Sequence, residues 1–149
     1  MSSLEATDRA ILRELAVDGR CSFTDLAERV GLSVSAVHQR VRRLEQRGVL
    51  QAYAARIDPG QIDLPLTALI SLTPIDPAAP DDYPRRLEQL AEIESCYSVA
   101  GEESYVLLVR VASPAALENL LRRIRESANV STRTTVVLST PYEHRPLKF

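Results

Sequence analysis

Tryptophan is absent from the 149 residues of this chain, methionine occurs once and cysteine only twice. Cys21 and Cys96 lie far apart, and neither has a second cysteine or a paired histidine at the spacing of a metal or redox site. We therefore interpret both as small buried thiols. No apolar run approaches the ~20 residues that a membrane-spanning helix needs, and the N-terminus lacks the features of a signal peptide. The sequence predicts a cytoplasmic protein.

An excess of one charge sign is also lacking, because the net charge is only −2. Residues 1–58 sum to +1 (nine Arg against eight acidic residues), and residues 59–149 sum to −3 (nine Lys and Arg against twelve acidic residues). The segment 33–47 alone carries four Arg and one Glu, or +3. A contact with nucleic acid requires such a local excess of positive charge, and an acidic remainder does not prevent it.

Apolar residues recur at helical spacing up to about residue 50, where the pattern changes to alternating β-branched runs. Ser22 begins the second predicted helix and Ser33 precedes the third, and these two helices are followed by Gly31 and Gly48. Serine is a favoured N-cap, and glycine accepts the positive φ of a helix C-terminus. Asp25, three residues after Ser22, resembles the acidic member of a capping box. The predicted helices span residues 5–17, 22–30 and 34–47.

The short turn at Gly31 joins two of these helices as in a helix-turn-helix, which makes the third helix the recognition helix. One apolar row should pack against the other two helices: Val34, Val37, Val41 and Leu44. The opposite face carries donors suited to phosphates and base edges, since Arg pairs with guanine and Gln with adenine. The alternative is a solvated basic face on a small helical domain. The residues predicted to contact DNA are Ser33, Ser35, Ala36, His38, Gln39, Arg40, Arg42 and Arg43.

After residue 65 the pattern predicts the order βαββαβ, which is that of the ferredoxin-like fold. Both helices then cover one face of the sheet, and the other face invites a partner subunit. Ser113 is placed to cap the last helix, whose first residue is Pro114. The predicted strands span residues 66–73, 95–99, 104–111 and 130–138, with a helix over 82–91 between the first two.

The boundary between the two parts is predicted at the turn Asp58-Pro59-Gly60. Before it, residues 49–57 have the pattern of extended chain. This stretch is either a strand that pairs with its equivalent in a second subunit or a plain linker, and the sequence does not distinguish the two. We therefore expect an α+β protein with a helix-turn-helix domain over 1–50, a strand or linker over 51–62 and a ferredoxin-like domain over 63–149.

No motif typical of catalysis is present in the sequence. His38 and His144 fall in different predicted domains without a Cys or Asp partner at ligand spacing, and there is no Gly-rich phosphate loop. On the recognition helix, His38 either contacts DNA, titrates near neutral pH or simply faces solvent. The sequence predicts a binding protein that is not an enzyme and holds no metal or cofactor.

Several motifs, taken together, resemble the Lrp/AsnC (feast/famine) family of regulators over essentially the whole chain. The first are Asp8-x-x-Ile-Leu, Asp18-Gly-Arg and Leu26-Ala27. From Gly31 the resemblance continues with Gly-Leu-Ser-x-Ser-Ala-Val-x-x-Arg-Val-x-x-Leu-Glu-x-x-Gly-Val. The segment Val99-Ala-Gly-Glu-Glu-Ser-Tyr is similar to the ligand loop of that family. The resemblance implies dimers built through the sheets with a strand-swapped linker, and four dimers closed into an octamer.

The resemblance also implies that an amino acid, or a related small metabolite, binds between neighbouring dimers. The family commonly has Asp before the tyrosine of the loop, whereas here Ser104 precedes Tyr105, which removes a negative charge that would meet an α-amino group. Glu102 or Glu103 substitutes for it, or the ligand preference differs, or the site is degenerate. The remaining alternative is that Gly101 merely turns a hairpin and the two glutamates are solvated. For the threonines of the last strand, the alternative to a ligand role is that alternate threonines simply suit a half-exposed strand. The predicted effector-binding residues are Val99, Ala100, Gly101, Glu102, Glu103, Ser104 and Tyr105, with Thr132 and Thr134 of the last strand.

The sequence thus predicts a homo-oligomeric regulator that binds double-stranded DNA with sequence preference and responds to a small effector. Two recognition helices would enter successive major grooves. The alternative is an architectural protein that organises DNA and responds little to ligand. The ratio of specific to non-specific affinity, about 10³ or more for a regulator, separates the two.

Overall fold

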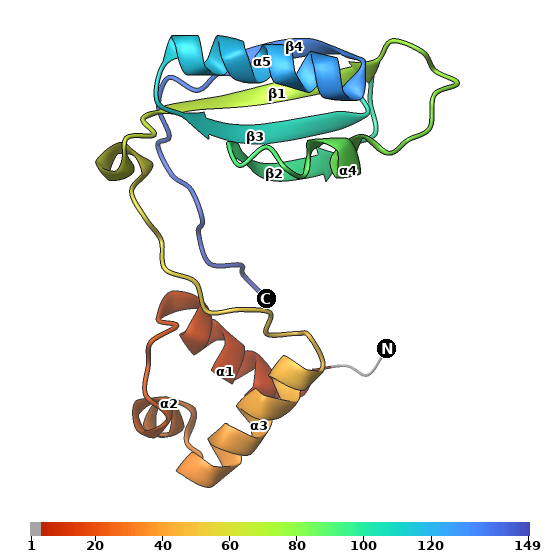
Figure 1. Cartoon of the computed structure of the whole chain (residues 1–149). Helices are drawn as coiled ribbons and strands as arrows, with labels where there is room; N and C mark the ends of the chain where they lie inside the picture. The colour runs from red at the N-terminus through yellow and green to blue at the C-terminus, as the bar shows by residue number, and fades with distance from the viewer. Residues whose placement is uncertain (1–3) are drawn as a thin grey trace. The chain divides into compact units, whose positions relative to one another are not determined.

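The computed structural model describes residues 4–149, which form two compact units (Figure 1). The first unit ends at Arg56 and also includes Tyr142–Phe149, and the second is Ile57–Pro141. Within residues 4–149, no helix combines the length and the apolar character needed to cross a bilayer.

Three helices make up most of the first unit: α1 (Ala6–Val17), α2 (Phe23–Val30) and α3 (Val34–Gln46). Their predicted bounds are confirmed to within one residue at each end. Gly31 and Gly48 have φ angles of 69° and 65°, a left-handed conformation that glycine adopts without steric cost. The turns that end α2 and α3 are therefore where the glycines predict them.

Serine side chains cap α2 and α3. The Ser22 hydroxyl oxygen accepts a hydrogen bond from the Asp25 N–H at 3.1 Å, and that of Ser33 accepts one from the Ala36 N–H at 3.3 Å. The capping box at Ser22 takes a different form from the motif, because the Asp25 carboxylate accepts from the Ser22 hydroxyl at 2.7 Å. Aspartate is one methylene shorter than the glutamate of the motif, which accepts from the backbone N–H of the cap.

Apolar side chains from all three helices enclose the core of the first unit. The predicted row on α3 is confirmed for Val37, Val41 and Leu44, which are at most 1% exposed. For Val34 the prediction is wrong, since this residue is 45% exposed. Val34 is the first residue of α3, and the neighbouring helices do not cover it there.

The C-terminal segment, which the sequence assigns to the second domain, is grouped with the first unit in the structure. Arg13 of α1 donates from Nε to the carbonyl oxygen of Phe149 at 2.7 Å, and its guanidinium lies 5.7 Å from the centre of the Phe149 ring. Arg56 donates to the carbonyl oxygen of His144 at 2.8 Å. The first unit is therefore built from two separate stretches of chain.

The linker before the second unit has no strand in the described chain, although residues 49–57 have the pattern of extended chain. The Tyr53 hydroxyl donates to the Glu45 carboxylate of α3 at 3.1 Å. Asp58 then caps the 3-10 turn Pro59–Ile62. Pairing of this stretch with a second copy stays a prediction.

The second unit holds a four-stranded antiparallel sheet in the order β2-β3-β1-β4. Its two helices lie against the same face of the sheet and share one apolar core with it (Figure 1). This arrangement confirms the ferredoxin-like βαββαβ fold. The elements in chain order are β1 (Leu66–Pro74), α4 (Tyr83–Leu87), β2 (Ile93–Ser98), β3 (Tyr105–Val111), α5 (Pro114–Ala128) and β4 (Val130–Val136).

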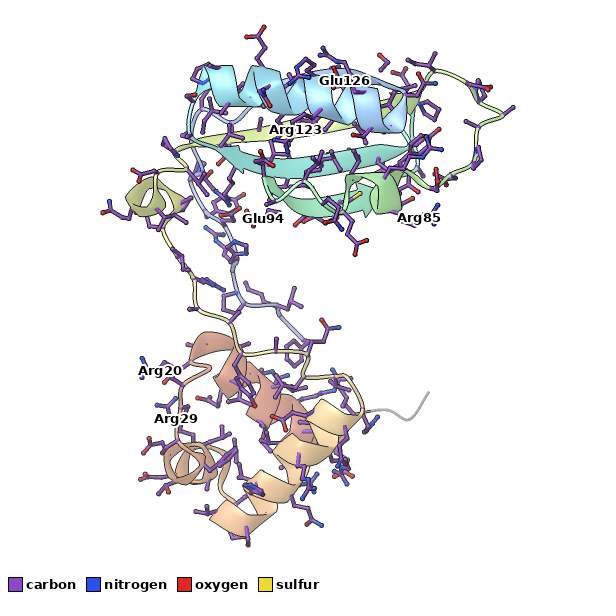
Figure 2. The ribbon with its side chains drawn as sticks, viewed as in Figure 1. Arg20, Arg29, Arg85, Glu94, Arg123 and Glu126 are labelled. Atoms are coloured by element: carbon purple, nitrogen blue, oxygen red, sulfur yellow. The ribbon has the colours of Figure 1, made fainter. Side chains whose placement is uncertain are left out.

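Helix α5 begins as predicted, because the Ser113 hydroxyl oxygen accepts from the Ala116 N–H at 3.2 Å. Further along, Arg123 of α5 makes a two-fold ion pair with Glu92, which precedes β2. The N···O distances are 2.6 and 2.9 Å. Figure 2 labels Arg123 on α5. This pair ties α5 to the turn that leads into the edge strand.

Helix α4 is shorter than the predicted 82–91. The Leu87 carbonyl accepts from the Leu90 N–H at 3.0 Å, which replaces the next α-helical bond by a tight turn. Strand β2 consequently starts early, at Ile93, and its Cys96 is exposed. Since Cys21 is only half-buried, the expectation of two buried thiols is wrong.

Candidate nucleic-acid interface and effector loop

The outward face of α3 presents uncommitted hydrogen-bond donors. His38, Gln39 and Arg42 are all exposed. The His38 ring stands edge-on to Phe23 of α2, with 5.1 Å between ring centres. Within residues 4–149, the side chains of Gln39 and Arg42 have no hydrogen-bond or ion-pair partner. These two side chains are free to bind an outside partner.

The N-terminus of α3 adds groups that suit a phosphate. The hydroxyls of Ser33 and Ser35 lie 3.2 Å apart and are exposed, and Ala36 is half-buried beside them. Free N–H groups and the helix dipole favour an anion at such a helix start. The structure thus places the predicted serines on the same surface as Gln39 and Arg42.

Two other arginines of α3 are engaged within the protein. Arg40 donates from Nη1 to Asp8 Oδ1 and to Glu5 Oε2, both at 2.8 Å, and Arg43 Nη2 lies 3.4 Å from Asp8 Oδ2. The hydrogen bond to Asp8, followed by that to Glu5, raises the pKa of the Arg40 guanidinium. Sequence analysis missed this cluster, although Asp8 stands in the apolar row of α1 with Ile11.

The loop predicted to bind effector is a short hairpin between β2 and β3. The Val99 N–H donates to the Ser104 carbonyl at 3.1 Å, and the Ser104 N–H donates to the Leu72 carbonyl of β1 at 2.9 Å. Between them, Glu103 is ion-paired with Arg133 of β4. Glu102 is exposed and has no hydrogen-bond or ion-pair partner in the described chain. The loop is therefore in contact with β4 through the side chain of Arg133, a residue that sequence analysis missed.

Tyr105 points to the core side of the sheet rather than to solvent. Its side chain is buried, and the ring meets Tyr83 of α4 edge-on at 6.0 Å between centres. The hydroxyl donates to Asp81 at 2.9 Å, and this bond raises the pKa of Tyr105. Tyr105 thus anchors the end of the loop.

The two threonines predicted on the partner side of the effector site share one face of β4. Thr132 and Thr134 pair with Leu72 and Ile70 of β1 in the register of the sheet, so they lie on the helix-covered face. Thr132 Oγ1 accepts from Arg125 Nε of α5 at 2.9 Å. Within one chain, it is Arg133 on the opposite face that contacts the loop.

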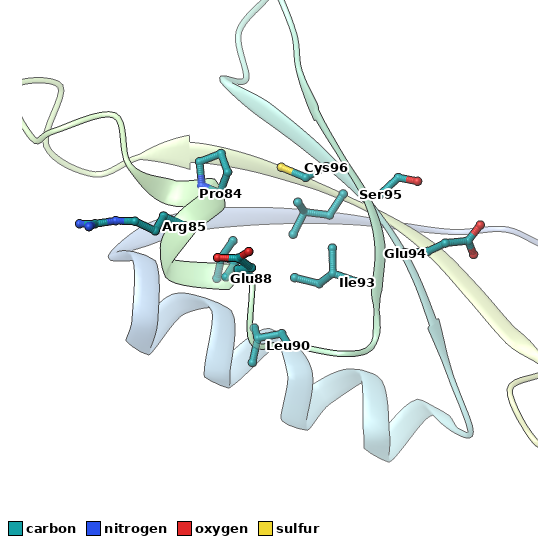
Figure 3. A pocket seen from close by; sticks show the side chains of 10 residues that line it. Pro84, Arg85, Glu88, Leu90, Ile93, Glu94, Ser95 and Cys96 are labelled. Carbon is teal, nitrogen blue, oxygen red and sulfur yellow. The ribbon is translucent and has the colours of Figure 1, made fainter. Parts of the chain in front are cut away.

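A cavity of about 480 Å³ lies elsewhere in the second unit, between α4 and β2 (Figure 3). Leu90 and Ile93 point into it, and Arg85 points away. None of the residues predicted to bind effector lines this cavity. Its other lining residues are Pro84, Leu87, Glu88, Glu94, Ser95, Cys96 and Leu107.

Two family models of known proteins match the chain, one after the other. Residues 4–51 match the model of a winged helix-turn-helix DNA-binding domain, and residues 67–147 match the Lrp/AsnC ligand binding domain. The chain belongs to the Lrp/AsnC family. It is therefore a DNA-binding transcriptional regulator of the Lrp type, as the sequence motifs predict.

Curated Lrp/AsnC relatives are similar over nearly the whole chain. The HTH-type transcriptional regulator LrpA of Mycobacterium tuberculosis is 61% identical over 143 residues, which cover 96% of this chain and 95% of that protein. The leucine-responsive regulatory protein of Escherichia coli is 38% identical over 140 residues, 91% of this chain and 85% of that protein.

Solved Lrp/AsnC structures agree with the fold. The feast or famine regulatory protein of M. tuberculosis, complexed with L-methionine, superposes with a TM-score of 0.94 at 61% identity, covering 96% of this chain and 97% of that one. A transcriptional regulator of Neisseria meningitidis, also in complex with L-methionine, has a TM-score of 0.89 at 28% identity, covering 98% and 97%.

Proposed function

We propose that this protein is a sequence-preferring regulator that inserts α3 into the major groove of double-stranded DNA. The observation that carries the proposal is the pair of exposed, unpartnered side chains Gln39 and Arg42 on one face of α3. Gln bonds to adenine and Arg to guanine through two hydrogen bonds each, which distinguishes one base pair from another. Ser33, Ser35, Ala36 and His38 flank them and would contact the phosphates.

The effector in this proposal is an amino acid bound at the loop of residues 99–105. Support comes from the two relatives whose structures contain L-methionine. In this chain, Glu102 supplies an unpaired carboxylate, and the Arg133 side chain is 71% exposed despite its ion pair. An α-amino acid carries one positive and one negative group, so these two charges suit it. Glu102 then replaces the charge that Ser104 does not provide.

The assembly in this proposal is a dimer formed through the uncovered face of the sheet, with four dimers in an octamer. Leu69 of β1 and Tyr97 of β2 lie on that face and are 37% and 53% exposed. Effector would bind between neighbouring dimers, where Thr132 and Thr134 of a second dimer would complete the site. Such binding typically changes the affinity for DNA by about 1–3 kcal/mol.

A fluorescence-anisotropy titration at fixed salt tests the proposal. The probe is DNA from upstream of the protein's own gene, competed by random DNA, with and without each common amino acid. We expect tighter binding to the upstream DNA by about 10³ and a change with at least one amino acid. Equal affinity for both DNAs, unaffected by every amino acid, would instead indicate an architectural protein.

A further inference from the structure

Asp8 is the one buried charged residue that the described chain contains, with 1% of its surface exposed. It lies on α1 in the apolar row that continues with Ile11 and Leu15. A buried carboxylate is strongly destabilising unless opposite charges and hydrogen bonds compensate it. The groups around Asp8 must therefore supply the opposite charge and the hydrogen bonds that its carboxylate needs.

Both partners of the Asp8 carboxylate come from the recognition helix. Its Oδ1 accepts from Arg40 at 2.8 Å, and its Oδ2 lies 3.4 Å from Arg43. Glu5 adds a second carboxylate on the same Arg40 nitrogen, at 2.8 Å. Two carboxylates thus face two guanidinium groups, and the cluster is neutral as a whole.

The arginines of α3 and its C-terminal cap are of two kinds, those that are ion-paired in this cluster and those that are not. Arg40 and Arg43 are held against α1, with side chains 26% and 47% exposed. Arg42 and Arg47 are exposed, and within residues 4–149 neither side chain has a hydrogen-bond or ion-pair partner. Only the second kind can neutralise a DNA phosphate without first breaking an ion pair.

We propose that Asp8 is a positioning residue for DNA binding, which holds Arg40 and Arg43 off the phosphates so that contact is made by Arg42 and Gln39. The inference rests on the proposed docking of α3 into DNA. The pairing of Asp8 with Arg40 and Arg43 limits the number of phosphate contacts that do not depend on sequence. A larger share of the binding energy then depends on base sequence.

The test is the salt dependence of binding to random DNA, because each neutralised phosphate contributes about 0.9 to the slope of log affinity against log salt. In Asp8→Asn the side chain keeps its size and one acceptor but loses its charge. We expect a slope steeper by about one to two units, because Arg43 loses its carboxylate partner and Arg40 keeps only that of the exposed Glu5. The preference for upstream over random DNA should fall at the same time.

A matched pair of variants keeps the inference testable if Asp8→Asn does not fold. Arg40→Gln retains a donor for Asp8 and should leave the wild-type slope unchanged, whereas Arg42→Gln should flatten it by about 0.9. Glu126→Gln, which breaks the Arg122–Glu126 pair on α5, is the control for the loss of a remote ion pair. It should leave the slope unchanged.

Two results would overturn the inference: a wild-type slope in a folded Asp8→Asn protein, or equal flattening by Arg40→Gln and Arg42→Gln. A merely structural role for Asp8 would lower the unfolding midpoint without moving the slope. The measurement uses random DNA, so it remains decisive even if the protein shows no preference for the upstream sequence. Failure of the proposed function and failure of this inference are therefore distinguishable.

Discussion

The guanidinium of Arg133 on β4 is ion-paired with the carboxylate of Glu103 in the loop between β2 and β3. The two residues are 30 positions apart in the chain, and β1 lies between β3 and β4 in the sheet. The Glu103 side chain is 19% exposed but that of Arg133 is 71% exposed. Glu103 thus fixes the position of a cation that still has room for a second anion.

Replacing Arg133 by Gln should weaken binding of the effector while leaving DNA binding without effector unchanged. An exposed charge pair contributes about 1 kcal/mol, so we expect a loss of affinity of about fivefold. Isothermal titration calorimetry with L-methionine, or with the amino acid that alters DNA binding, measures it. Arg122→Gln on the outer side of α5 is the matched control. Identical titrations for all three proteins would remove Arg133 from the site.

Gly101→Asp should abolish the ligand response without unfolding the protein. A Cβ built at Gly101 meets the Glu103 carboxylate at 3.7 Å, an ordinary contact distance, so the fold accepts a side chain there. An added carboxylate would place a second negative charge beside Glu103 and would occupy space at the loop where the effector is proposed to bind. Gly101→Asn has the same size without the charge and should bind better than Gly101→Asp. An unaltered response of Gly101→Asp would mean that the loop does not bind the effector.

Gln39→Ala and Arg42→Ala should each weaken binding to the preferred DNA site by about 1–3 kcal/mol, because each removes a side chain able to bond twice to a base. Both residues are exposed and unpartnered within residues 4–149, so the unfolding midpoint should stay near that of the wild type. Anisotropy with the preferred site and thermal denaturation measure the two effects. Unchanged affinity in both variants would show that this face of α3 does not read the DNA.

The stability of the second unit should depend on pH through Glu92. Hydrogen bonds from Arg123 lower the pKa of Glu92 below its ordinary value of 4.5. A carboxylate whose pKa is lowered by folding stabilises the folded state fully above 4.5, and this contribution is lost as the pH falls through the lowered value. Urea denaturation at neutral pH should therefore show a loss in Glu92→Gln that disappears in acid. An equal loss at both pH values would exclude this origin.

Local chemistry made the helical part of the fold predictable from sequence. Ser33 and Gly48 mark the two ends of α3 because cap and turn conformations are set by the residues themselves. The end of α4 was not predictable in this way, because it depends on a turn from Leu87 to Leu90 that brings β2 to the sheet edge. Exposure of Val34 likewise depends on how far the neighbouring helices extend.

The candidate sites show the same division between local and distant effects. Helical spacing alone identified Gln39 and Arg42 as outward-facing, and the structure places both on the surface. The pairing of Asp8 with Arg40 joins residues 32 positions apart, and no spacing rule connects them. A lone acid in an apolar row was the available signal, since such a residue needs a buried partner.

The contact of Phe149 with Arg13 makes the DNA-binding unit a discontinuous domain, because its last stretch is supplied from the far end of the polypeptide. A fragment that stops at Arg56 would keep the three helices but lose this stretch. Conversely, after a single proteolytic cut between the units at Ile57, the three helices would be held only by the non-covalent contacts of this C-terminal stretch, which stays joined to the second unit at Pro141. The two halves of this regulator are connected by two polypeptide segments, and after a cut in the linker alone the helices stay with the second half only as firmly as the C-terminal stretch binds them.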